Sequence, residues 1–168
     1  GGAGYRDLCL TALQPFRAAL EAHRDGEPPY VGPTSELGLV IYGLTRISGL
    51  LGEPALLEDA RRLARFVTPQ RITNDREFDV LAGNAGMVLA LLTLYQATGE
   101  EALLSKAVAC GRHLLQHRVA SAVGLRSWPT LDGQLLAGFS HGAAGIATAL
   151  LRLGRAADDS AFTDAALE

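Results

Sequence analysis

The sequence contains few of the residues that mark several protein classes. Only two cysteines occur among 168 residues, too few for a disulfide framework, so we expect reduced thiols and a cytoplasmic location. No apolar run reaches the roughly 18 residues that a membrane span requires, and we expect no transmembrane segment. The net charge is −3 and the basic residues are dispersed, which argues against a DNA or RNA partner.

Strand patterns are equally scarce, because no stretch alternates apolar and polar residues with β-branched enrichment. Apolar residues are abundant: 48% of the chain is hydrophobic and only 20% is charged, which is enough for a sizeable core. The composition therefore predicts one all-α domain over residues 1–168, with no second domain in this chain.

A repeat organises the chain. The segment "GEPALLEDA" from Gly52 matches "GEEALLSKA" from Gly99, and "DDSAFTDAA" from Asp158 is a weaker third copy. Each copy follows an apolar run that begins with a glycine. Two kinds of helix in alternation are typical of an open solenoid or a closed α/α toroid, and periodicity does not choose between them.

The two kinds of segment predict two layers of helices. The apolar runs have hydrophobic residues on all sides, so we expect them to be inner helices, whereas the repeated segments have one apolar stripe and are expected outside. Pro15 is expected to kink the first outer helix. The predicted inner helices lie near residues 37–51, 84–98 and 142–154, and the outer helices near 5–22, 54–67, 100–118 and from 159 onward.

Residues 138–142, Gly-Phe-Ser-His-Gly, fit the nucleophile-elbow pattern of serine hydrolases. An elbow needs a preceding strand and a later triad histidine, and no histidine follows His141, so this function is rejected. Two interpretations remain open. Ser140 can be a helix N-cap beside small residues that let helices approach closely, or His141 can act as an acid or base at a helix N-terminus.

Asp79 presents the same choice between a cap or turn residue and a functional group. It precedes the helix start of the adjacent repeat. In a toroid, Asp79 and His141 then face the same end of the central cavity. The sequence therefore predicts a candidate acid–base site made of these two residues.

Two other features have open interpretations. Cys110, His113 and His117 are metal-ligand types on one helix face, which we expect to be solvent-exposed, with an adventitious surface metal site as the alternative. The long connection 118–138 holds the sole tryptophan, Trp128. It is either a surface loop that Trp128 pins or a rim that contacts substrate through Trp128.

Three segments together carry a family resemblance: "ELGLVIYGLTRISGLLGEPALLEDA", "FDVLAGNAGMVLALLTLY" and above all "GFSHGAAGIATALLRL". In order and spacing they resemble the lanthionine synthetase C-like cyclase family, and particularly the C-terminal cyclase domain of class II lanthipeptide synthetases. The resemblance implies an α/α toroid of seven inner and seven outer helices. About three of the seven hairpins, a partial domain, would then be present in this chain.

The resemblance also implies a reaction. Zinc-dependent cyclases of this family add a cysteine thiol of a precursor peptide to dehydroalanine or dehydrobutyrine, which forms a lanthionine or methyllanthionine thioether ring. His141 matches the family's active-site histidine in its "SHG" motif, and Asp79 matches the aspartate of its "DVxxGxAG" motif; both imply acid–base roles.

The family's zinc ligands lie in motifs beyond residue 168, so we expect this chain to bind no zinc and to be inactive alone. A dehydratase domain is expected to precede the cyclase domain in the full-length protein. The alternative function is a non-catalytic helical scaffold or a degenerate cyclase-like domain that binds peptide.

Overall fold

The computed structural model describes residues 2–23, 34–121 and 124–168. Within these ranges the chain is helical apart from its connections and one small antiparallel hairpin, so the all-α prediction is confirmed. The helices are α1 (Gly2–Ala22), α2 (Thr34–Leu51), α3 (Pro54–Ala64), α4 (Pro69–Asn74), α5 (Asn84–Thr98), α6 (Glu101–Gln116), α7 (Ala143–Ala157) and α8 (Ser160–Leu167), and the hairpin strands are β1 (Val119–Ala120) and β2 (Arg126–Ser127).

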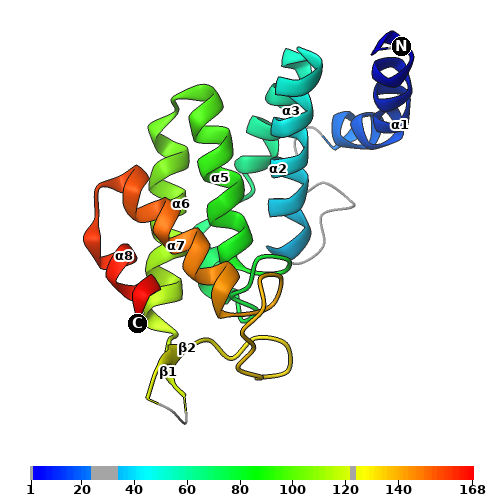
Figure 1. Ribbon diagram of the computed structural model, residues 1–168. Coiled ribbons are helices and arrows are strands. Elements are labelled where there is room, and N and C mark those ends of the chain that lie inside the picture. The colour runs from blue at the N-terminus through cyan, green and yellow to red at the C-terminus, as the bar shows by residue number, and fades with distance from the viewer. Residues whose placement is uncertain (1, 24–33, 122–123) are drawn as a thin grey trace.

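The helices form the predicted double layer (Figure 1). Helices α2, α5 and α7 are the inner helices, and each packs against the next one in the series. Each also packs against the outer helix that follows it in the chain: α2 against α3, α5 against α6, and α7 against α8. The chain therefore forms three inner–outer pairs of an α/α toroid, with bounds within a few residues of those expected.

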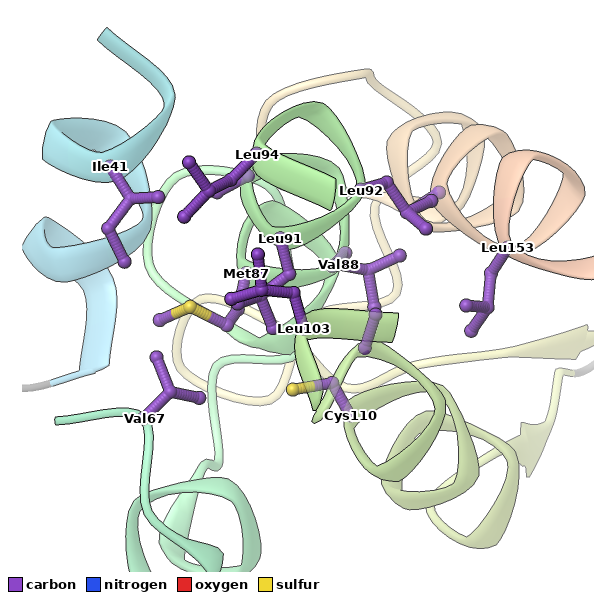
Figure 2. Packing of buried hydrophobic residues seen from close by; sticks show 14 of the residues in the cluster. Ile41, Val67, Met87, Val88, Leu91, Leu92, Leu94, Leu103, Cys110 and Leu153 are labelled. Atoms are coloured by element: carbon purple, nitrogen blue, oxygen red, sulfur yellow. The ribbon is translucent and has the colours of Figure 1, made fainter. Parts of the chain in front are cut away.

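Helix α5 is the centre of the hydrophobic core because it lies between α2 and α7 and rests on α6. It carries no charged residue, and most of its side chains are buried. Figure 2 shows Met87, Leu91 and Val88 of this helix meeting side chains of the neighbouring elements. Burial of one such side chain contributes about 1.5–3 kcal/mol, so this contact network is a main source of stability. The neighbours labelled there are Ile41, Val67, Leu103, Cys110 and Leu153.

The turns between inner and outer helices confirm the alignment of the three repeats. Gly52 and Gly99 have φ values of 66° and 71°, and the aligned Asp158 has a φ of 50°. All three lie in the left-handed region, which aspartate tolerates better than most residues other than glycine. The third copy therefore makes the same turn without a glycine.

The structure differs from the expected elements after α3. The outer helix expected over 54–67 ends at Ala64, and α4 follows it as a separate short helix. Pro69 occupies its first turn and Thr68 caps it by accepting a hydrogen bond from the Arg71 amide, a start signal that the sequence analysis overlooked. Helix α1 contains Pro15 and bends in Figure 1, as expected for an internal proline.

None of the described helices is long and apolar enough to cross a membrane. The two cysteines, Cys9 on α1 and Cys110 on α6, are both free thiols.

Candidate active site

Two tight loops of the same design precede α5 and α7. A Cβ atom added to Gly86 would lie 2.0 Å from the carbonyl oxygen of Val80, and one added to Gly145 would lie 1.8 Å from that of Phe139. Both contacts are far below van der Waals distance, so each loop needs glycine where it folds back on its own helix start. The Gly-rich segments are thus explained by backbone packing.

The two loops are joined by their main chains. The carbonyl oxygen of Ser140 accepts hydrogen bonds from the amides of Val80 and Leu81, at 3.2 and 3.3 Å. This bridge brings together the two residues that the sequence analysis selected. Nδ1 of His141 lies 2.6 Å from Oδ2 of Asp79, across 62 residues of sequence.

Asp79 is fully buried, with 0% of its surface exposed. Its Oδ1 accepts a hydrogen bond from the Ala82 amide at 2.6 Å, and its carbonyl oxygen accepts from the amides of Gly83 and Gly86. A buried carboxylate needs such partners to offset its lost hydration. Asp79 is therefore a turn residue and the partner of His141 at once, and the two interpretations of this residue do not exclude each other.

The His141 side chain is 36% exposed, in contrast to its carboxylate partner. Because a carboxylate only accepts, the contact with Asp79 assigns a proton to Nδ1, and Nε2 carries the lone pair in the neutral ring. Within the described residues Nε2 has no hydrogen-bond partner. This ring nitrogen is the atom of the pair that can exchange a proton with a bound molecule.

Two residues that the sequence analysis missed support the pair. Thr130 is 1% exposed, and its hydroxyl donates to the carbonyl oxygen of His141 at 2.5 Å. Asp75 is 3% exposed and accepts from the amides of Glu77 and Phe78 through Oδ1 and from that of Asn84 through Oδ2. Asp75 therefore fastens both ends of the loop that carries Asp79.

The backbone just before Asp79 is strained. Phe78 has a φ of 61°, which is rare for an aromatic residue. Its ring stacks on His113 of α6 and on His117, which follows that helix, with centroids 5.8 and 5.2 Å apart. Nε2 of His113 donates to the carbonyl oxygen of Asp75 at 3.0 Å. These contacts hold the loop in a conformation that its own residues do not favour.

The expected solvent exposure is wrong for Cys110 and His113, whereas His117, just after α6, is partly exposed. Cys110 is 0% exposed because it belongs to the hydrophobic core, and His113 is 5% exposed because the loop from Asp75 to Phe78 packs against it. Burial raises the pKa of the Cys110 thiol and lowers that of His113. No group of three or more side chains that could hold a metal ion was found among the residues that the structure describes.

Two further expectations concern Ser140 and Trp128. The N-cap of α7 is Gly142, without a side-chain hydrogen bond, and Ser140 is exposed, so the expectation of a Ser140 cap is wrong. Trp128 is 3% exposed and its Nε1 donates to the carbonyl oxygen of Leu114 at 2.8 Å, the placement of a residue that anchors the connection 118–138. Residues 122 and 123 of that connection lie outside the described part. A role of Trp128 in substrate binding stays a prediction.

Comparison with known proteins identifies the family of the chain. The family model of lanthionine synthetase C-like proteins matches residues 2–168, a range that includes both Gly-rich loops and the residues that support them. A search of curated proteins gave no match. The match covers nearly the whole chain, and the chain belongs to the lanthionine synthetase C-like family.

Proposed function

We propose that this chain carries the acid–base pair of a cyclase that forms lanthionine or methyllanthionine rings in a precursor peptide. Membership of the family implies a lanthionine cyclase-type function. The observation that carries the finer proposal is the 2.6 Å contact between His141 and the buried carboxylate of Asp79.

The proposed reaction needs one proton transfer in each direction. The sulfur of a peptide cysteine forms a bond to the β-carbon of dehydroalanine or dehydrobutyrine, and the electron pair of the C=C bond moves to the α-carbon and its carbonyl as an enolate. The thiol proton is lost, and the α-carbon gains a proton. His141, through Nε2, is suited to both transfers because histidine is the side chain that most often serves as a general acid or base.

Asp79 gives this histidine its orientation. Its carboxylate holds the proton on Nδ1 and stabilises the imidazolium that forms when Nε2 takes up a proton. Because Asp79 is buried and is also bonded to the Ala82 amide, its position does not depend on a bound substrate. The pair is therefore ready before the peptide arrives.

The family typically binds zinc, whose chemistry is to stabilise a thiolate nucleophile. The described residues do not fit such an ion. They contain no suitable group of ligands, and the Cys110 thiol is buried with a raised pKa. The proposal assigns no metal ligand to this chain, and proton transfer is the contribution of its own residues.

The proposal extends to the setting of the reaction. We assign the chain to the cyclase domain of a class II synthetase, as a partial domain over residues 1–168 that is inactive by itself. A dehydratase domain in the full-length protein would supply the dehydrated precursor peptide, and the reaction would take place in the cytoplasm. The support is the "GFSHGAAG" motif together with the free thiols of Cys9 and Cys110.

A second candidate function is a non-catalytic scaffold that binds peptide. The large apolar side chains exposed on the inner helix α2 and on the site loop favour it, since such patches mark binding surfaces. Tyr42, Leu39 and Phe139 are 42%, 47% and 53% exposed. A scaffold binds peptide without closing rings, so activity separates the two candidates.

The test is ring formation on a dehydrated precursor peptide by the intact protein that contains this chain. Free thiols are alkylated and counted by mass spectrometry. His141→Ala is expected to lower the rate at least about 100-fold, the usual contribution of a general acid–base group, whereas the matched loop variant Ser140→Ala keeps most of it. Ring formation by His141→Ala at the wild-type rate contradicts the proposal, and no ring formation by the wild type favours the scaffold.

A further inference from the structure

Arginines within the outer helices are paired with acidic side chains. Arg61 of α3 pairs with Glu58 and Glu100. Arg62 of the same helix lies 3.3 Å from Glu21, and Arg112 of α6 lies 2.9 Å from Asp159. The outer layer therefore neutralises its own guanidinium groups.

The inner helices differ from the outer ones in this respect. Helix α5 has no charged residue, α2 has Glu36 and Arg46, and α7 has Arg152 and Arg155. Across the described ranges these three arginines make no hydrogen bond or ion pair, and all three are exposed. The inner layer thus presents unpaired positive charge on a surface that is otherwise nearly uncharged.

Arg152 lies at a groove between the three inner helices. The groove has a volume of about 250 Å³ and an apolar lining. Val80 and Phe139, which line it, belong to the two loops that carry Asp79 and His141. The groove therefore begins beside the candidate site and runs along the inner face. Its lining residues from the helices are Gly38, Leu39, Tyr42, Gly86, Leu89, Thr148 and Arg152.

We propose that this groove is a binding subsite for a peptide segment in which a large apolar side chain stands next to a carboxylate, with the carboxylate bound by Arg152. The inference rests on the proposed function, because it takes the substrate peptide as the occupant. Charge complementarity supports an acidic segment, since an unpaired guanidinium beside an apolar groove binds a carboxylate through two parallel hydrogen bonds. Tyr42, Leu39 and Phe139 supply the apolar contact.

The length of α7 between His141 and Arg152 sets the spacing, in the bound peptide, between the residue that reacts and the acidic residue. Arg152 lies nine residues beyond Ala143, where α7 begins, which is about 14 Å along the helix at 1.5 Å per residue. An extended peptide covers about 3.3 Å per residue. Arg152 can therefore hold an acidic residue of the peptide that lies about four positions from the peptide residue that reacts at His141.

The first test measures binding without chemistry. Two fluorescein-labelled peptides without a dehydrated residue, Ser-Gly-Gly-Leu-Asp-Gly-amide and its Asn twin, are titrated with the intact protein by fluorescence anisotropy at low salt. The wild type is expected to bind the Asp peptide roughly threefold to tenfold more tightly, the range for an exposed bidentate ion pair. Added salt is expected to reduce this preference.

Matched variants locate the effect. Arg152→Gln is expected to bind both peptides equally, whereas Arg155→Gln, which changes an exposed arginine one turn along α7 that does not line the groove, keeps the preference. Circular dichroism checks that each variant is folded. Equal affinity of the wild type for the two peptides, no binding of either, or equal losses in both variants overturns the proposal.

A final measurement separates this inference from the proposed function. His141→Ala is expected to keep the full preference for the Asp peptide, because the probe contains no reacting group. If no variant of the protein closes rings but the preference still depends on Arg152, the subsite stands and the cyclase proposal fails. If rings close normally and Arg152→Gln leaves the preference unchanged, the subsite is wrong and the cyclase proposal stands.

Discussion

His141 and His113 both make a hydrogen bond to the loop that runs from Asp75 to Asn84, but they differ in the group they meet and in their exposure to solvent. His141 meets the buried carboxylate of Asp79 and is 36% exposed, whereas the hydrogen-bond partner of His113 is the carbonyl oxygen of Asp75, and His113 is 5% exposed. A charged partner together with access to solvent allows proton exchange. Burial against a carbonyl and two aromatic rings instead favours the neutral form. Residue type and spacing alone did not separate these two histidines.

The largest effect is expected when the charge of Asp79 is removed without changing its shape. Asp79→Asn keeps one oxygen, which can accept from the Ala82 amide, but its NH2 group then faces Nδ1 of His141 as a donor. The ring loses the tautomer that leaves Nε2 free to accept a proton, and the imidazolium loses its carboxylate. The rate of ring formation is expected to fall about 100-fold or more, with little change in the urea concentration at half-unfolding. A rate within a factor of about two of the wild type would show that the histidine works without its carboxylate.

The stability of the loop is expected to depend on Asp75. Asp75→Ala removes the acceptor of three backbone amides, so the free energy of unfolding should fall by about 3 kcal/mol. Urea denaturation measures this loss, and Asp164→Ala, an exposed position on α8, is the control. Equal stabilities of the two variants would show that the loop is held by its other contacts.

Acid is expected to weaken the fold through His113. Burial lowers the pKa of this imidazole in the folded state, so the unfolded chain binds more protons once the pH falls below the ordinary histidine pKa near 6.5. Its contribution to stability is therefore complete above that pH and declines as the pH falls. His117, Asp75 and Arg76 are the titratable or charged groups that act on it.

Urea unfolding measured at pH values on both sides of this range tests the expectation. His113→Phe should show a weaker loss of stability on acidification than the wild type, because it removes the imidazole that takes up a proton when the chain unfolds. An unchanged pH dependence in His113→Phe would assign the effect to another group.

The smallest effect is expected at Ser140. Because its side chain is exposed and does not cap α7, Ser140→Ala should change the free energy of unfolding by less than about 0.5 kcal/mol. Ring formation should continue at most of the wild-type rate in the alkylation assay. A dead Ser140→Ala variant beside an active His141→Ala variant would revive the nucleophile interpretation of the Gly-x-Ser-x-Gly pattern.

The sequence predicted the helices well because the signals are local. Helix α5 has apolar residues on all sides and is buried on most of them, whereas α3 has a single apolar stripe and buries that side. The short helix α4 was missed although Thr68 and Pro69 form a start signal, since six residues are too few for a periodic pattern. Asp79 and His141 could be selected because both precede the glycines of a helix start.

By itself, the sequence determined the two kinds of paired helices, their alternation between two layers, and the two residues that stand at the candidate site. Only the tertiary structure decided that Asp79 and His141 touch, that Thr130 and Asp75 support them, and that the Cys110 face of α6 is buried. The reason is that these contacts join segments far apart in the chain. The periodicity of α6 shows that one face of the helix is apolar. The burial of His113, outside that face, depends on contacts with the loop from Asp75 to Phe78, and no pattern within α6 predicts those contacts.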